Sequence, residues 1–167
     1  MFVKENTVLV IIDVQGKLAQ LMYKKEELFE SLQTLIKGIS ILEVPVIWVE
    51  QLPEKIGPTI PEVANLMEEL MPDVKPIPKK SFSCCGNAQF MEKFNSINRK
   101  QVLVVGIESH ICLYQTAVEL LESGYEVQVV ADCVSSRTKE NKQIGIKRIV
   151  QAGGSMTSTE MIIFELM

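Results

Sequence analysis

The chain has 167 residues, of which 47% are hydrophobic and 23% are charged. This length can bury one sizeable core but not two comfortable ones, so we expect a single domain over residues 1–167. The net charge of −4, from 17 basic and 21 acidic residues, comes without any basic run, which argues against a nucleic-acid partner.

The cysteines and the apolar runs indicate in which cellular compartment the protein is found. The four cysteines form no C-x-x-C pair and no metal-finger spacing, and the N-terminal MFVKENTVLV lacks the long apolar region of a signal peptide. The longest apolar runs have the length of a strand, whereas a membrane span needs about 20 residues. We therefore expect a cytoplasmic protein without membrane contact.

Apolar runs of strand length alternate with helical patterns along the chain. The run TVLVIIDVQ at 7–15 predicts a strand covered on both faces, and apolar residues at helical spacing from Leu28 to Leu42 predict a helix after it. The breaker-rich segment 51–61 predicts irregular structure at the rim of a site. Further strands are expected at 46–50, 75–78, 102–106, 125–132 and near Met156, and further helices at 62–70, 88–94, 113–121, 139–152 and the C-terminus.

This alternation predicts an α/β fold, in which a parallel sheet carries helices on both faces. Functional sites in such sheets form at the carboxyl ends of the strands. Three reactive residues fall there: Asp13 after the first strand, Lys79 after the third and Cys112 after the fourth. Neighbouring central strands would bring them together.

Each of these residues also has an ordinary structural explanation. Cys112 lies near the first turn of a helix, where free N–H groups and the helix dipole lower the pKa of a thiol, but free cysteines are also among the most buried residues. Asp13 is either a general acid/base or a loop carboxylate that ends a strand. Lys79 either stabilises a thiolate or is a solvated loop lysine.

The other candidate nucleophiles and bases are weaker. His110, the only histidine, lies two residues from Cys112 in a turn where side chains diverge, so it is disfavoured as the base. Cys84, Cys85 and Cys133 are expected to be packing or loop residues.

Three segments taken together resemble a known family. The strand ending in IIDVQ, the motif K-x-x-F-S from Lys79 to Ser83, and G-I-E-S-H-I-C-x-x-Q-T-A from Gly106 to Ala117 resemble the isochorismatase-like cysteine hydrolases, in the expected order. The segments VEQLPEKIGPTIPEV and VVADCVSSR are similar to the isochorismatase-domain-containing branch. The resemblance covers the chain from Thr7 to about Thr159.

The resemblance implies a fold and a set of site residues. The fold is a three-layer, Rossmann-like α/β domain with a six-stranded parallel sheet in the order 3-2-1-4-5-6. The catalytic triad is Asp13, Lys79 and Cys112. The family also has a cis peptide bond that corresponds to Ile107-Glu108, which would turn the backbone N–H groups of Glu108 and Cys112 toward an oxyanion.

Two departures from the family bear on cofactor and reaction. Relatives that hydrolyse nicotinamide carry an Asp-x-His metal motif after the second strand, where this chain has Glu50-Gln51-Leu52-Pro53, so we expect no metal and no cofactor. True isochorismate hydrolases do not use a cysteine nucleophile, so Cys112 argues against that reaction. Gln51 and Phe82 are the candidates for substrate binding.

The prediction is a cysteine-dependent hydrolase that acts on a small amide, ureide or carbamoyl compound through a thioester. The alternative is a non-enzymatic α/β binding or scaffold module of the same fold. Within that class, a receiver would need a further acidic residue beside Asp13, and dinucleotide binding would need G-x-G-x-x-G after the first strand. The substrate is expected to be a small molecule. Because such relatives are commonly dimers or larger, we also expect a homo-oligomer.

Overall fold

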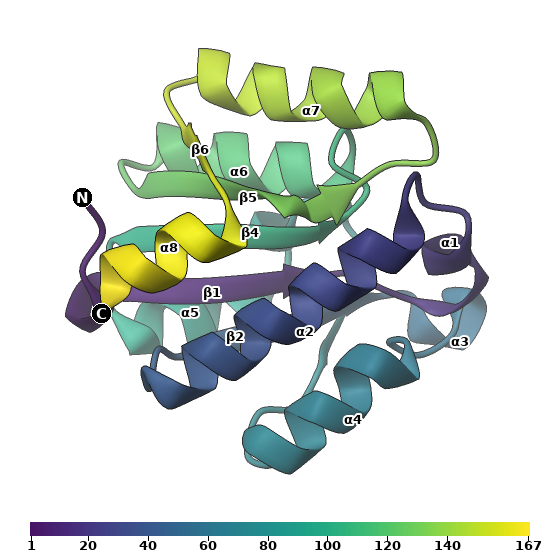
Figure 1. Cartoon of the computed structure of the whole chain (residues 1–167), viewed down its shortest axis with the longest axis horizontal. Coiled ribbons are helices and arrows are strands. Elements are labelled where there is room, and N and C mark those ends of the chain that lie inside the picture. Colours follow the sequence, from purple (N-terminus) through teal and green to yellow (C-terminus); the bar gives the residue numbers. More distant parts are fainter.

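A computed structural model describes all 167 residues, from Met1 to Met167. One sheet of six parallel strands runs through the molecule in the order β3-β2-β1-β4-β5-β6, which confirms the expected order (Figure 1). The strands are β1 Thr7–Ile12, β2 Val46–Gln51, β3 Ile77–Lys79, β4 Gln101–Ile107, β5 Glu126–Ser135 and β6 Ser155–Thr157.

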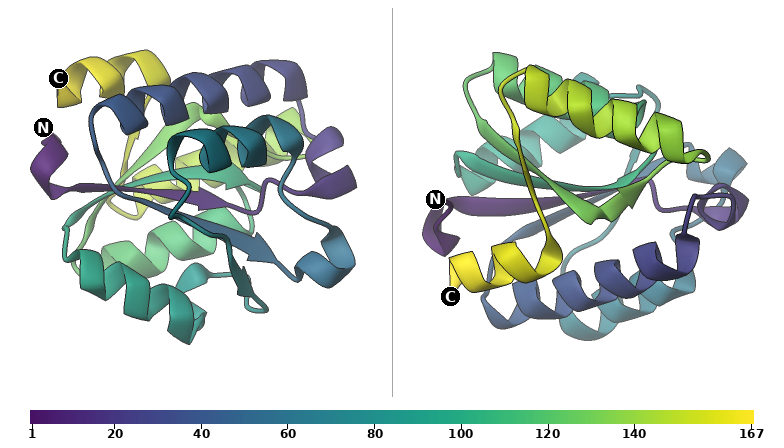
Figure 2. Two further views of the ribbon diagram at one scale, coloured as in Figure 1. Left: turned by 90° about the horizontal axis from the view of Figure 1, so that it is seen from below. Right: turned by 45° about the horizontal axis from the view of Figure 1, so that its top comes forward.

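Helices cover both faces of the sheet, as the alternation of elements predicts. Helices α2, α4 and α8 pack on one face, and α5, α6 and α7 pack on the other (Figure 2). The α-helices are α1 Gly16–Gln20, α2 Lys25–Ile41, α3 Pro53–Ile56, α4 Pro61–Leu70, α5 Ala88–Ile97, α6 Cys112–Glu122, α7 Lys139–Gln151 and α8 Thr159–Leu166. None of them has the length and apolar composition that crossing a membrane requires.

The continuous apolar sequence of β1 follows from its central position. Leu9 and Ile11 belong to the core beneath α2 and α4, whereas Val8, Val10 and Ile12 belong to the core beneath α5 and α6. Side chains alternate between the two faces of a strand, so a strand covered on both faces carries apolar side chains at successive positions, here from Val8 to Ile12. All six residues of β1 are buried.

Some boundaries differ from those expected. β1 ends at Ile12 rather than Gln15, because the backbone of Asp13 turns into the left-handed region with a φ of 54°. The short helix α3 lies where irregular chain was expected, and α1 lies where no element was predicted; neither is long enough to show a helical repeat in sequence. β5 continues to Ser135, past the expected end at Asp132.

Gly106 allows the ends of β1 and β4 to meet. Its φ is 117°, and a Cβ atom there would lie 1.9 Å from the carbonyl oxygen of Ile12. No other residue type fits such an approach. The turn that precedes Cys112 therefore starts directly beside the end of β1, where Asp13 lies.

Candidate active site

Asp13 and Lys79 form a buried ion pair at the carboxyl edge of the sheet. Asp13 follows β1, and Lys79 is the last residue of β3, two strands away in the sheet. The Lys79 Nζ lies 2.8 Å from the Oδ2 of Asp13, and the side chains are 0% and 4% exposed. The structure therefore brings these two predicted site residues into direct contact.

The Lys79 ammonium is fully occupied by its neighbours. Besides Asp13, it donates to the Oε1 of Gln51 at 2.6 Å and to the carbonyl oxygens of Ser81 and Phe82 at 3.1 and 2.8 Å. Four acceptors surround a group that has three protons. Lys79 is thus fixed in place and is not the solvated loop lysine considered above.

Only one oxygen of Asp13 is held by Lys79. The other, Oδ1, is buried and accepts no hydrogen bond from any N–H or O–H group; besides Lys79, the Cys112 thiol is the one hydrogen-bond donor that affects the pKa of this carboxyl. A buried polar atom without such a partner is rare and often belongs to a functional site. Cys112, the first residue of α6, lines the same small cavity as Asp13 and is 8% exposed.

The electrostatics of the thiol differ from the sequence-based expectation. Burial, followed by the negative charge of Asp13, raises the pKa of Cys112 to about 12, and Lys79 offsets only part of this rise. The expectation that the helix N-terminus lowers this pKa is therefore wrong. Desolvation of the thiolate outweighs the helix dipole here.

The same environment acts on the acid. Burial raises the pKa of Asp13 above its ordinary value of 3.8, and the nearby charge of Lys79 lowers it only in part. A carboxyl with a raised pKa is better matched to proton transfer near neutral pH than an ordinary aspartate. Cys112 thus carries a protonated thiol, and Asp13 carries a carboxylate that is more basic than that of an ordinary aspartate.

Two backbone N–H groups near the sulfur are without partners. The Ile107-Glu108 peptide bond is cis, as the resemblance implies. The N–H groups of Glu108 and Cys112 donate no hydrogen bond within the chain, whereas those of Ser109 and Ile111 do. Free N–H groups beside a nucleophile are the donors that an oxyanion requires.

The cavity that these groups share is small and has mostly apolar walls. Its volume is about 130 Å³. It is lined by Asp13, Gln15, Leu18, Gln51, Ile56, Phe82, Ile107, Glu108, Ile111 and Cys112. Sequence reasoning missed its apolar wall, because nothing in the local pattern of Leu18, Ile56 or Ile111 distinguishes them from packing residues.

Gln51 and Phe82, the two residues expected to bind substrate, both line this cavity. The Gln51 amide, however, is largely committed to the protein. Its oxygen accepts from Lys79, and its nitrogen donates to the carbonyl oxygen of Lys80 at 2.9 Å. Phe82 is 57% exposed, which places its ring at the mouth of the cavity.

A buried polar network holds the segment between β2 and α4 against the site. The Gln15 amide donates to the carbonyl oxygens of Gln51 and Gly57 at 3.0 and 2.7 Å. The Oε2 of Glu50 accepts from both the backbone N–H and the hydroxyl of Thr59 at 2.7 Å. Because of these bonds, Ile56 is held in position as part of the cavity wall.

The remaining candidates lie outside the site. The Nδ1 of His110 is 2.8 Å from the hydroxyl of Ser136, and His110 does not line the cavity. Cys84 and Cys133 are fully buried, and Cys85 is half-buried. Burial raises the pKa of Cys84 to about 12 and that of Cys85 to about 11.

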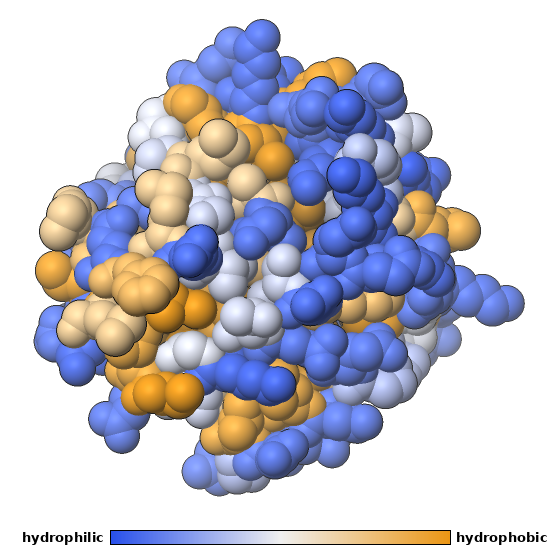
Figure 3. Space-filling view, viewed as in Figure 1, coloured by the Kyte–Doolittle hydropathy of each residue, from blue (hydrophilic) through white to orange (hydrophobic).

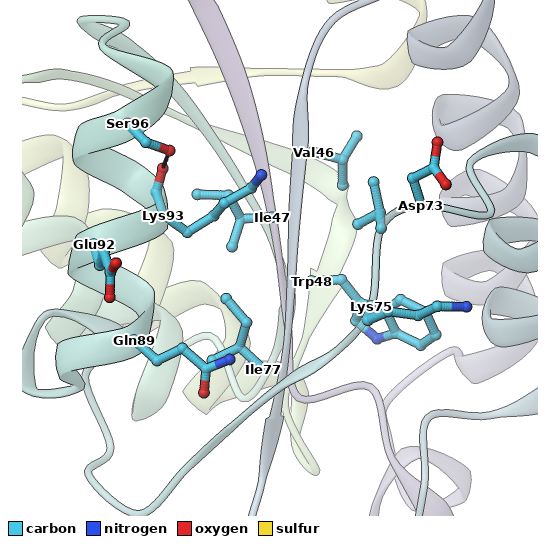
Figure 4. A pocket seen from close by; sticks show the side chains of 11 residues that line it. Val46, Ile47, Trp48, Asp73, Lys75, Ile77, Gln89, Glu92, Lys93 and Ser96 are labelled. Carbon is cyan, nitrogen blue, oxygen red and sulfur yellow. Dashed lines mark hydrogen bonds between the residues drawn. The ribbon is translucent and has the colours of Figure 1, made fainter.

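A larger cavity, of about 440 Å³, lies at the opposite end of β2 (Figure 4). Val46, Ile47 and Trp48 from the first half of β2 line it, with Lys93 from α5 and Lys75 near β3. The groups that line it include no cysteine, serine–base pair or unpaired buried acid. Its size alone does not make it a reactive site.

Comparison with known proteins identifies relatives that align over nearly all of this chain and about four fifths of their own length. The family model described as the isochorismatase domain matches residues 7–161. The secreted isochorismatase effector Isc1 of Phytophthora sojae is 35% identical over 98% of this chain and 78% of its own. Isochorismatase domain-containing protein 2 of Danio rerio is 32% identical over 97% of this chain and 79% of its own.

Known structures share the fold across the chain. A structure described as the MAR1 ribonuclease of Caenorhabditis elegans is 33% identical with a TM-score of 0.90, and the match covers 99% of this chain and 83% of that one. The nicotinamidase PncA of Bacillus subtilis has a TM-score of 0.80 at 13% identity, which shows the fold alone; this match covers 92% of this chain and 99% of that one. With the family model matched over most of its length, this chain belongs to the isochorismatase family.

Proposed function

We propose that this protein is a cysteine-dependent hydrolase of small amides, ureides or carbamoyl compounds, in which Asp13, Lys79 and Cys112 form the triad. The observation that carries the proposal is the state of Asp13. One of its oxygens is held by Lys79 at 2.8 Å, the other is buried without an N–H or O–H partner, and both Asp13 and Cys112 line the same cavity. Membership of the family supports a hydrolase.

In the first half of the reaction, the unpaired oxygen of Asp13 takes the proton of the Cys112 thiol as the sulfur attacks the substrate carbonyl carbon. The carbonyl electron pair moves to oxygen, and the free N–H groups of Glu108 and Cys112 bind this oxyanion. Collapse breaks the C–N bond, and Asp13 returns the proton to nitrogen, so that ammonia or an amine leaves.

In the second half, water hydrolyses the thioester. Asp13, again a carboxylate, takes a proton from the water molecule as the water oxygen attacks the acyl carbon. The C–S bond then breaks, the carboxylic acid leaves and the thiol regains its proton. Lys79 keeps one carboxylate oxygen occupied throughout, so the same atom of Asp13 acts in each step.

Two other functions are less well supported by the site. The C. elegans relative is described as a ribonuclease, but here the only cation in the site, Lys79, is committed to four acceptors and the chain carries a net charge of −4. Cleavage of a polyanion relies on cations that contact phosphate. A purely structural module has no need of a buried, unpaired carboxylate oxygen.

Ammonia release from small amides tests the proposal, with RNA as a comparison substrate. We expect amide turnover without RNA cleavage. Because Asp13 must be ionised to act as base and burial raises its pKa, kcat/KM falls as the pH drops through a value above 3.8. Because the thiol pKa is about 12, kcat/KM shows no further rise near pH 8–9, where an ordinary thiol ionises. Such a rise would favour a pre-ionised thiolate.

We further infer that the protein self-associates through α8. Met161, Phe164 and Met167 are 61%, 67% and 78% exposed; a spacing of three residues places Met161 and Phe164 on one side of α8, and Met167 directly follows the helix. Apolar side chains gather over α8 and the nearby termini (Figure 3). Contiguous exposed patches of this kind commonly mark protein interfaces. The YcaC protein of Escherichia coli, which shares the fold, is described as octameric.

Light scattering coupled to size-exclusion chromatography tests this inference. We expect a mass above that of one chain for the wild type and a shift toward one chain for Phe164→Glu, because the charge disrupts the apolar contact. Ile144→Glu on α7, an exposed apolar residue that is 52% exposed, is the matched control and keeps the wild-type mass. A wild-type protein with the mass of one chain contradicts the inference.

A further inference from the structure

The size of the cavity limits the acyl group of a substrate. Its volume of about 130 Å³ lies below the range of about 300–1,000 Å³ that is typical of sites for drug-sized ligands. An engineered apolar cavity of about 150 Å³ in another protein binds one benzene ring. An acyl group up to about the size of a single ring, or a short branched chain, therefore fills the space beside the Cys112 sulfur.

The walls of the cavity favour an apolar acyl group. Leu18, Ile56, Phe82, Ile107 and Ile111 come from four separate segments and converge on the space. Their side chains offer no hydrogen bond, so a polar substituent on the acyl chain would lose its water without gaining a partner. An alkyl or aromatic group is stabilised by leaving water for the same surroundings.

Each charged group that lines the cavity already has a partner within the chain. Asp13 is paired with Lys79, whose ammonium has four acceptors. Glu108 is paired with Arg137, whose Nε lies 3.1 and 3.2 Å from the two carboxylate oxygens. Arg137 itself does not line the cavity. Two carboxylates are therefore in the wall, and no cation there is free to meet a substrate anion.

A negatively charged substrate would be strongly disfavoured under these conditions. A carboxylate loses its hydration on entry, and burying a charge without a counterion is among the most unfavourable events in a protein interior. The carboxylates of Asp13 and Glu108 add repulsion to this loss of hydration. The carbonyl oxygen of a neutral amide, in contrast, finds the free N–H groups of Glu108 and Cys112.

We propose that the site selects neutral amides with a compact, apolar acyl group and rejects amides that carry a carboxylate. The inference rests on the function proposed above and narrows it, because it separates simple amides from carbamoyl and ureido acids. The apolar wall and the pairing of every charged group in it together support this inference.

A matched pair of substrates tests this selectivity. 4-Methylpentanamide and succinamate have the same chain length and the same number of non-hydrogen atoms, but the first ends in an isopropyl group and the second in a carboxylate. We expect kcat/KM for ammonia release to be at least about 100-fold higher for the neutral amide. Comparable or higher values for succinamate overturn the inference and leave the cysteine hydrolase standing. If neither of these substrates nor any other small amide is hydrolysed, the proposed function itself is overturned.

A substitution at the mouth of the cavity tests the cause of the selectivity. Phe82 is exposed, so Phe82→Arg supplies the missing cation with little risk to folding. We expect Phe82→Arg to raise kcat/KM for succinamate about tenfold or more relative to Phe82→Gln, which removes the ring without adding charge. Equal values for the two variants would contradict the view that the lack of a free cation excludes anions.

Discussion

Replacement of Cys112 by alanine is expected to lower kcat/KM for amide hydrolysis by about 10⁴-fold or more, because the covalent route loses its nucleophile. Cys112→Ser should lower kcat/KM to a similar extent, since a hydroxyl is far harder to deprotonate than the thiol. Initial rates of ammonia release measure the effect, and the acyl adduct on the Cys112 peptide should disappear from mass spectra of the quenched reaction.

The control for this experiment is Cys85→Ala. Cys85 is also a free, partly accessible cysteine, but it does not line the cavity. We expect Cys85→Ala to retain the wild-type rate and Cys112→Ala to retain the wild-type thermal unfolding curve. Turnover that survives in Cys112→Ala would show that the reaction does not pass through a thioester on this residue.

The second large effect concerns the buried pair of Asp13 and Lys79. Asp13→Asn leaves an ammonium without its counterion, and Lys79→Met leaves a carboxylate without its cation, with both groups almost completely buried. Each single substitution is expected to destabilise the protein by about 3–5 kcal/mol, whereas the double variant should regain a large part of that loss. Chemical unfolding of the four proteins measures the free energies.

Activity separates the chemical role of the pair from its structural role. In the proposed mechanism, Asp13→Asn removes the carboxylate that takes the thiol proton, so the double variant should be as inactive as the single variants even where it regains stability. Stability losses that simply add would show that the two charges are not coupled in the fold. Activity restored in the double variant would show that Asp13 is not the base.

The alternation of apolar runs and helical patterns was sufficient to predict a parallel sheet with helices on both faces, and β1 and β4 were expected near its centre because they are apolar on both faces. The order of the strands came from the resemblance to the family. The sequence was also sufficient to place Asp13 and Cys112 at one edge of the sheet, since both follow such strands. Lys79 was harder to predict, because β3 has only three residues and one of them is proline. There the motif, rather than the pattern of hydrophobicity, indicated the position.

Other features depend on contacts that are remote in sequence. The thiol pKa of Cys112 is set mainly by its burial and by Asp13, which is 99 positions away in the chain, whereas its place at a helix N-terminus predicted a shift in the opposite direction. The commitment of Gln51 to Lys79 and the position of Ile56 in the cavity wall are likewise tertiary. Local patterns contain no information on how much water a side chain loses on folding.

The segment from Leu52 to Ile60 has a consequence for how relatives of this protein can diverge. It supplies Ile56 to the cavity but none of Asp13, Lys79 and Cys112, and it is anchored at its end by hydrogen bonds from the N–H of Gly16 to the carbonyl oxygen of Pro58 and from the N–H of Ile60 to the carbonyl oxygen of Val14. Replacements between these anchor points can reshape the wall while the reactive groups stay in place. In the proposed hydrolase, new substrate preferences can thus arise through changes in one tethered segment, while Asp13, Lys79 and Cys112 stay the same.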